Sequence, residues 1–406
     1  MPGVLDGIRV IEVATWGFIP SAGVALADWG AEVIKIEHPA HGDPMRGLVS
    51  AALTPPGTQP ISYMFQTFSR NKSSVGIDLT TEAGRDVLYR LVAGADVFLT
   101  NYLTPVRRKL QIDVDDLTAV NPRLVYARGS GLGPQGEEAD TGGFDLASYW
   151  SRGGVGYVST PDGAEEPPPM PGAAFGDLQS GLYAAGGVAG ALFARERTGC
   201  AQVVDVSLLG AAVWGTAPHI AASSLFGIDA MPRGDHRSAH NPISNTYRTL
   251  DGRFIALVML ESDRFWAPLM ELVGRPDLAG DPRFSDAAAR ASNSVACIAE
   301  LDALFLTRSA DEWREILGRQ SGVWAVVQSP QETSLDPQVV ANHYVRSLDL
   351  DTDTTLSVAM LPVQFNGRHP DPSPAPELGA HTEEVLLGLG YDWDQLVALK
   401  VDGAIS

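Results

Sequence analysis

Two aspartates follow glycine-containing turns in the middle of this sequence. Asp145 comes directly after Gly-Gly-Phe, and Asp177 follows Phe-Gly. A carboxylate is an anion at neutral pH, so it can attack an activated carbonyl group or exchange a proton. An aspartate before an apolar run also caps a helix through its side chain. Both interpretations stay open, because helices are predicted to begin at Leu146 and over 178–197.

Strand and helix patterns alternate through the part of the chain that must position these aspartates. Strands are predicted over 7–13, 32–37, 73–79, 96–100, 123–127 and 202–207, with helices over 21–29, 81–92 and 116–120 and a loop over 40–70. A strand, a helix and a second strand within about thirty residues are typical of a parallel sheet. We therefore predict an α/β, Rossmann-like domain that binds its ligand at the carboxyl ends of the strands.

Residues 131–136 match the spacing G-x-G-x-x-G, but the residues that follow are acidic and lack an apolar helical stripe. A dinucleotide fingerprint needs a helix N-terminus beneath the pyrophosphate. We therefore reject a nicotinamide-binding role for this segment.

The formal net charge of −20 argues against nucleic acid or an anionic membrane surface as a partner. The chain has only two cysteines, which suits a reducing, cytoplasmic compartment and gives no Cys-x-x-Cys metal pattern. No signal peptide is recognised, and the longest weakly polar run, 181–194, is too short to span a bilayer.

Short segments in a fixed order along nearly the whole chain resemble the class III CoA-transferases. That family includes formyl-CoA transferase, carnitine CoA-transferase and 2-methylacyl-CoA racemase. Each segment is weak alone, and their order carries the resemblance. The segments are residues 5–10, 29–37, 71–75, 121–126, 143–145, 176–177, 198–205, 247–253 and 378–382.

The resemblance implies an α/β fold with a large Rossmann-like, CoA-binding domain and a smaller α/β domain. The large domain would take residues 1–220 and the returning tail 375–406, and 331–374 would be a linker. The small domain would take 225–330, with a strand over 253–259 and helices near 263–273 and 296–307. Two chains of the family thread through each other as interlocked rings, so a homodimer is expected.

By resemblance, Asp145 takes the place of the aspartate nucleophile of the transferases. It would attack a thioester to form a mixed anhydride, which CoA thiolate converts to an aspartyl-CoA thioester. An acceptor acid then repeats the exchange. The expected partners are an acyl-CoA and a carboxylic acid, with no metal and no cofactor beyond coenzyme A as substrate.

The racemases of the family have a histidine before the first aspartate and pair it with the later Gly-Asp aspartate. Phe144 replaces that histidine and cannot exchange a proton, which disfavours the racemase alternative. Asp177 is then an acid/base group or a structural cap, and Glu261 matches a racemase glutamate or is a loop acid. A catalytically weak acyl-CoA-binding protein is a further alternative.

The segments that hold CoA in the family also map onto this sequence. The expected CoA-binding residues are His38, Ile77, Asp78, Leu79, Thr80, Asn101, Tyr102, Leu103, Lys109, Arg128 and Ser130. His38 replaces a family arginine, and a glycine-rich flap of formyl-CoA transferase is missing around 234–244, where His236 and His240 occur. This departure disfavours an oxalate and formate substrate pair, and the acyl group and acceptor do not follow from the sequence.

Overall fold

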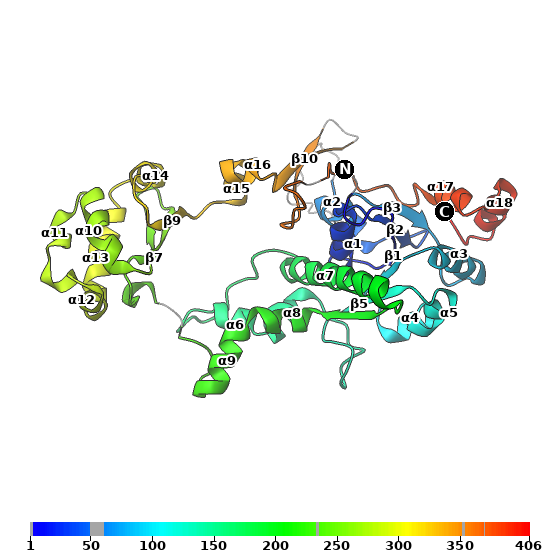
Figure 1. Cartoon of the computed structure of the whole chain (residues 1–406), viewed down its shortest axis with the longest axis horizontal. Helices are drawn as coiled ribbons and strands as arrows, with labels where there is room; N and C mark the ends of the chain where they lie inside the picture. The colour runs from blue at the N-terminus through cyan, green and yellow to red at the C-terminus, as the bar shows by residue number, and fades with distance from the viewer. Residues whose placement is uncertain (1–2, 49–60, 233–234, 351–353, 369) are drawn as a thin grey trace. The chain divides into compact units, whose positions relative to one another are not determined.

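The fold is that of a computed structural model, which describes residues 3–48, 61–232, 235–350, 354–368 and 370–406. The chain forms two compact units, which are described separately below (Figure 1). The large unit takes 1–160, 166–230 and 337–406, and the small unit takes 161–165 and 231–336.

A six-stranded sheet forms the centre of the large unit. Its strands are β1 (Arg9–Val13), β2 (Glu32–Glu37), β3 (Ser73–Gly76), β4 (Val97–Thr100), β5 (Val125–Ser130) and β6 (Val203–Ser207). All neighbours are parallel, in the order β3-β2-β1-β4-β5-β6. This is the Rossmann strand order, whose connections reverse direction between β1 and β4. The predicted α/β class with a parallel sheet is confirmed.

Helices cover both faces of this sheet, because its Val- and Ile-rich strands are apolar on both sides. One face packs against α1 (Phe18–Asp28), α7 (Phe175–Thr198) and α8 (Leu208–Gly215). The other packs against α3 (Glu82–Ala93), α5 (Val114–Val120), α17 (Thr382–Gly388) and α18 (Trp393–Val401).

Helices α1 and α7 lie side by side (Figure 1). Their close approach depends on Gly181 of α7, because a Cβ there would lie 2.7 Å from the carbonyl oxygen of Phe18 and even closer to the Ser21 side chain. The close packing of α7 on α1 therefore depends on this small residue.

The tail of the chain lies against the edge strand β3. Ile405 forms an isolated antiparallel bridge with Ile77, and the N–H of Ser406 donates to the carbonyl of Gly76 at 3.2 Å. Leu386 and Leu396, from α17 and α18, are buried in the core on this side of the sheet.

The segment 331–374, expected to be a linker, contains regular structure. It includes most of α15 (Pro330–Leu335), all of α16 (Pro337–Ala341) and an antiparallel hairpin of β10 (Val345–Asp349) and β11 (Thr355–Ala359). Leu348, Val358 and Met360 form a small core of their own there.

The expected loop over 40–70 also contains regular structure, and that expectation was wrong for the residues described. They form the short 3-10 turn η1 (Pro44–Gly47) and helix α2 (Tyr63–Ser69), while 49–60 lie outside the described residues. Phe65 and Phe68 of α2 are buried, so this helix is held by apolar packing.

The large unit also contains α4 (Thr104–Leu110), the π-helical turn η3 (Leu146–Arg152), α6 (Val155–Ser159) and α9 (Ala217–Phe226). Residues 131–141 form turns and bends, as expected once the dinucleotide fingerprint is rejected. None of the described helices has the length and apolarity needed to cross a membrane.

The small unit has an antiparallel sheet of β7 (Ser244–Arg248), β8 (Phe254–Val258) and β9 (Val323–Val326). Its helices are α10 (Ser262–Leu272), α11 (Pro276–Ala279), α12 (Ala287–Ser292), α13 (Ser294–Phe305) and α14 (Ala310–Leu317), with 3-10 turns η4 (His236–Ser238) and η5 (Pro282–Phe284). Trp266 and Trp313 are buried in its core. The strand predicted over 253–259 and the helices predicted near 263–273 and 296–307 are confirmed by β8, α10 and α13.

Candidate active site

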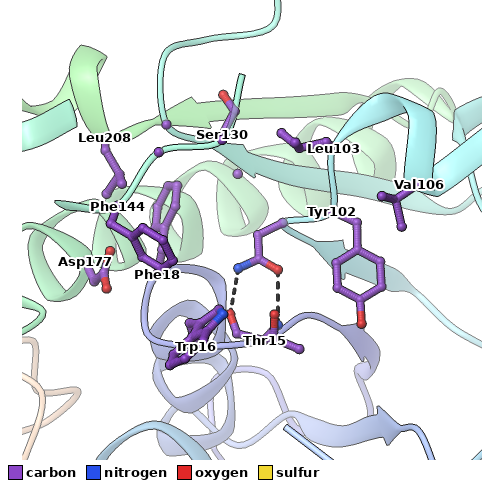
Figure 2. A pocket seen from close by; sticks show the side chains of 15 residues that line it. Thr15, Trp16, Phe18, Tyr102, Leu103, Val106, Ser130, Phe144, Asp177 and Leu208 are labelled. Carbon is purple, nitrogen blue, oxygen red and sulfur yellow. Dashed lines mark hydrogen bonds between the residues drawn. The ribbon is translucent and has the colours of Figure 1, made fainter. Parts of the chain in front are cut away.

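A cavity of about 310 Å³ lies in the large unit where strands β1, β4 and β5 end (Figure 2). Strands β1 and β4 flank the point at which the sheet order reverses, where open α/β sheets bind their ligands. The cavity is lined by Thr15, Trp16, Phe18, Asn101, Tyr102, Leu103, Val106, Gly129, Ser130, Gly131, Gly142, Gly143, Phe144, Asp177 and Leu208.

The loop after β1 is fixed from two sides. Asn101 accepts a hydrogen bond from the Thr15 N–H at 3.1 Å and donates one to the Thr15 carbonyl at 2.6 Å, as the dashed lines in Figure 2 show. The N–H of Trp16 donates to Oδ1 of Asp43 at 3.1 Å. Trp16 has a φ of 66°, a backbone conformation that is uncommon for a bulky residue. The paired contacts hold this unfavourable turn in place.

A fully buried ion cluster supports the same loop. Glu12 accepts from Lys35 at 3.0 Å and from Lys72 at 2.6 Å, and Lys35 also pairs with Asp43 at 2.9 Å. Lys35 in addition donates to the carbonyl of Ala14 at 2.8 Å. Asp43 therefore connects this cluster to the backbone of Trp16.

Asp177 is the charged side chain among the described residues that line the cavity. It lies in the first turn of α7, next to the loop after β1. A Cβ added to Gly17 would lie only 2.5 Å from Oδ2 of Asp177, so glycine is required at position 17 for this approach. Burial, followed by the charge of Asp145, raises the pKa of Asp177 to about 7. The pKa of Asp177 therefore lies near neutral pH, and no cationic side chain is found among the described lining residues.

Asp145 does not line the cavity, although its neighbours Gly143 and Phe144 do. It caps η3, because its Oδ1 accepts from the N–H of Leu146 at 2.8 Å, and its side chain is buried. The interpretation of Asp145 as a cap of the helix beginning at Leu146 is confirmed. Burial raises the pKa of Asp145, opposed by the Leu146 N–H. An added Cβ at Gly176 would lie 3.0 Å from Cβ of Asp145, so this aspartate adjoins the start of α7.

The interpretation of Asp177 as a helix cap was wrong. Helix α7 begins at Phe175, three residues earlier than predicted, and its N-cap is Ala174 with a φ of 62°. Asp177 is therefore inside the first turn.

Four of the expected CoA-binding residues meet at the cavity: Asn101, Tyr102, Leu103 and Ser130. Tyr102, Leu103 and Ser130 also line a smaller adjoining cavity of about 40 Å³, together with Arg128. Arg128 is paired there with Asp205 at 2.5 Å.

The other expected CoA-binding residues lie elsewhere in the large unit. His38, after β2, has its Nε2 3.8 Å from Oδ1 of Asp78, after β3, and Thr80 donates to the same oxygen. Ile77 and Leu79 are buried in the core below them, so their side chains are not free to contact a ligand. Lys109 is exposed on α4.

Glu261 belongs to the small unit, where it is exposed and pairs with Arg264 at 3.3 Å. His236 is in the same unit, and both of its ring nitrogens are engaged, Nδ1 with Asn245 at 3.1 Å and Nε2 with Asp302 at 3.0 Å. This histidine is fixed by its neighbours. Within the described ranges, no three His, Cys, Asp or Glu side chains are grouped so as to hold a metal ion.

The sequence did not single out Thr15, Trp16 and Phe18, although it predicted ligand binding at the carboxyl ends of the strands, where their loop lies. Trp16 contacts Phe144 edge-on, with ring centroids 5.9 Å apart. Figure 2 shows these two rings and Asp177 at one end of the cavity, with Tyr102 and Val106 at the other.

The fold and the cavity define an α/β protein of the Rossmann type with an uncompensated carboxylate at the switch point of its sheet. Residues 5–382 match the sequence model of CoA-transferase family III, and the chain belongs to this family. The predicted resemblance is confirmed.

Two relatives carry more specific names. The chain is 31% identical to cinnamoyl-CoA:phenyllactate CoA-transferase of Clostridium sporogenes, over 98% of this chain and 96% of that protein. It is 30% identical to (R)-2-hydroxy-4-methylpentanoate CoA-transferase of Clostridioides difficile, over 98% of each. A crystal structure of a CAIB/BAIF family protein from Brucella suis is similar, with a TM-score of 0.83 and 27% identity over 96% of this chain and 100% of that one.

Proposed function

We propose that this protein transfers CoA from an acyl-CoA thioester to a carboxylic acid, with Asp177 as the nucleophile. The observation that carries the proposal is the position of Asp177, whose carboxyl group lines the cavity at the sheet's switch point. Membership of CoA-transferase family III supports the reaction class.

The proposed chemistry uses the Asp177 carboxylate alone as the covalent group. One of its oxygens attacks the thioester carbonyl and the C–S bond breaks. CoA leaves as a thiolate, and the acyl group stays on Asp177 as a mixed anhydride. The thiolate attacks the aspartyl carbonyl and releases the donor acid as a carboxylate. The acceptor carboxylate then attacks the resulting aspartyl-CoA thioester, and CoA thiolate attacks the acyl carbonyl of the second anhydride. Acyl-CoA forms and Asp177 is regenerated.

The role that resemblance gave to Asp145 passes to Asp177 in this proposal. Asp145 is buried and accepts a hydrogen bond from the Leu146 N–H with one of its oxygens, whereas Asp177 lines the cavity. A carboxyl group with a raised pKa is also a more basic nucleophile, and with a pKa of about 7 it is half ionised at neutral pH. We propose that Asp145 contributes its charge to this shift.

The racemase alternative lacks a second carboxyl or imidazole group among the described residues that line the cavity. Phe144 fills the position where a proton-exchanging side chain would be needed, and Asp177 is the acid among the described lining residues. Slow exchange of α-deuterium from solvent into a 2-methylacyl-CoA, far slower than CoA transfer, is expected.

Covalent trapping tests the nucleophile. The protein is incubated with an acyl-CoA panel, treated with hydroxylamine and digested, and the peptides are sequenced by mass spectrometry. We expect a hydroxamate at Asp177 and an unmodified Asp145. Modification of Asp145 alone would restore the earlier assignment, and modification of neither aspartate across the panel would contradict the covalent mechanism and favour a protein that only binds acyl-CoA.

The CoA moiety is proposed to enter along the strand ends that carry Asn101, Tyr102, Leu103 and Ser130, all of which line the cavity. His38, Asp78, Thr80, Lys109 and Arg128 remain predicted contacts for the more distant parts of CoA. For Ile77 and Leu79 only backbone contacts are proposed, because their side chains are buried.

We also propose a homodimer of interlocked chains, as in the family resemblance. Helix α9 supports an intermolecular contact, because it has no buried residue although it is rich in apolar side chains. Trp214 of α8 and Leu225 and Phe226 of α9 are among the most exposed apolar residues of the described chain. Large exposed apolar patches mark interaction surfaces. Light scattering at micromolar concentration should give twice the chain mass, and a single-chain mass would contradict the proposal.

A further inference from the structure

We infer that Trp16 and Phe144 determine substrate specificity and select carboxylic acids with an apolar, preferentially aromatic, side group. The inference rests on the proposed function and names the substrate class of the same cavity. It is carried by the geometry of the two rings beside Asp177.

The two rings form one wall of the cavity from two separate loops. Their centroids are 5.9 Å apart and their planes meet at 85°, the edge-to-face arrangement that aromatic pairs prefer. The chain places one ring after β1 and the other next to Asp145, the N-cap of η3. Asp177 lines the same cavity, so a group bonded to its carboxyl would lie beside this wall.

Neither ring belongs to a core. Phe144 is 62% exposed and Trp16 is 36% exposed, whereas the aromatic residues that pack the sheet, such as Phe98 and Tyr126, are fully buried. Exposed aromatic faces lining a concave site are available to a ligand and offer edge and face contacts to another ring.

The structure fixes the Trp16 backbone, which carries the indole ring, at a cost in backbone strain. Trp16 adopts a left-handed φ of 66° and is held there by Asp43, which is itself 2% exposed and paired with Lys35. Strained backbone persists where its surroundings over-determine it, and such residues gather at functional sites. The arrangement is therefore pre-organised to present the indole ring.

The remainder of the lining is unfavourable for a second negative charge. Phe18, Leu103, Val106 and Leu208 are apolar, and among the described lining residues none is Lys, Arg or His. A second carboxylate on the substrate would lie in the cavity with the like charge of Asp177 and without a cationic partner among the described lining residues, and a charge in such a place is strongly disfavoured. Dicarboxylic acids are thereby excluded in favour of monocarboxylic acids with a bulky apolar group.

A competition experiment tests this selectivity. The full-length protein is given one acyl-CoA donor and an equimolar mixture of 3-phenylpropanoate, 4-methylpentanoate, succinate and glutarate, and new thioesters are quantified by mass spectrometry. We expect 3-phenylpropanoate to have the highest kcat/KM, with 4-methylpentanoate next and each dicarboxylate at least about 100-fold lower.

Two alanine variants test whether the wall formed by Trp16 and Phe144 determines the selectivity. Trp16→Ala and Phe144→Ala should each lower kcat/KM for 3-phenylpropanoate about tenfold or more and narrow its advantage over 4-methylpentanoate. Phe144→Arg should raise the use of succinate and glutarate at least about tenfold. Trp393→Ala removes an equally large exposed ring from α18, away from the cavity, and should leave the selectivity unchanged.

The outcomes separate the inference from the proposed function. Transfer to a dicarboxylate at a rate equal to 3-phenylpropanoate, or unchanged selectivity in both alanine variants, overturns the inference and leaves the transferase intact. Absence of transfer to any acid, with no hydroxamate at Asp177, overturns the proposed function as well. Melting temperatures are recorded for each variant, and Phe144→Ala keeps the test decisive if Trp16→Ala does not fold.

Discussion

The large unit contains two groups of carboxylates in opposite surroundings. Glu12, Asp43 and Asp28 are paired with buried cations, namely Lys35, Lys72 and Arg70, at 2.6 to 3.0 Å. Asp145 and Asp177 adjoin the cavity, and burial and their mutual charge raise the pKa of Asp177 to about 7.

This difference separates a structural use of buried charge from a reactive one. A paired carboxylate is fixed and its lone pairs are occupied, so it holds the loop after β1 but cannot attack a carbonyl group. An unpaired carboxylate costs stability and remains basic and free to react. Perturbed pKa values of this origin, in a cavity, are typical of functional sites.

The largest effect is expected from Asp177→Asn, which removes the carboxylate proposed to react and keeps the size and shape of the side chain. We expect CoA transfer to fall by at least about 10⁴-fold, because the proposed nucleophile is lost. The free energy of unfolding should stay equal or rise, since an amide avoids the cost of burying an unpaired charge. Steady-state transfer and urea denaturation measure the two quantities.

Asp145→Asn is the matched control for that variant. It keeps the hydrogen bond to the Leu146 N–H and should retain transfer within about tenfold of the unmodified protein. Loss of transfer in Asp145→Asn together with retained transfer in Asp177→Asn would reverse the two roles.

Breaking an ion pair of the buried cluster should lower the stability of the protein. Lys72→Met leaves Glu12 with one partner fewer in a fully buried position, which we expect to lower the free energy of unfolding by about 3–5 kcal/mol. Lys400→Met breaks an exposed pair with Glu383 and should cost no more than about 1 kcal/mol. Urea unfolding of both variants checks the contrast, which fails if the two losses are equal.

The smallest effect is a pH dependence that only the unpaired group should show. Because the pKa of Asp177 is about 7, transfer should fall about tenfold per pH unit below 7 and level off above it. Asp145→Asn should move the midpoint to lower pH, since the Asp145 charge is the second cause of the shift after burial. A pH–rate profile measures the midpoint, and an unmoved midpoint would exclude Asp145 as a cause.

Stability should respond to the same titration with a defined sign. The folded state binds the Asp177 proton more tightly than the unfolded chain, whose ordinary value is 3.8. The contribution of this group is therefore fully present below about pH 4 and is lost as pH rises through about 7. The free energy of unfolding, measured with urea between about pH 4 and pH 7, should therefore fall less with rising pH in Asp177→Asn than in the unmodified protein.

The sheet was predictable from the sequence because its strands are short apolar runs rich in Val and Ile between turn residues. The predicted bounds of β2 coincide with those observed, and the other five strands differ by a few residues at one or both ends. Such runs are predictable because burial on both faces leaves little choice of residue type.

The site was less predictable, because it depends on two left-handed residues that their types do not indicate. Ala174 and Trp16 both have φ near 65°, which few residues other than glycine adopt. The first moves the start of α7 back to Phe175 and turns Asp177 into the cavity. The left-handed conformation of Trp16 depends on a hydrogen bond to Asp43, 27 residues away, which no local sequence pattern predicts.

The return of the tail to β3 constrains the order in which a ribosome can produce a finished fold. The core beside β3 needs Leu386, Leu396 and Ile405, which are translated long after the six strands. The core of the small unit lies entirely within residues 239–326, so its residues have all been synthesised while this side of the large unit still lacks part of its cover. The nascent chain must therefore keep the edge of an apolar sheet unpaired through much of its own synthesis, a period in which binding by a chaperone would protect it from aggregation.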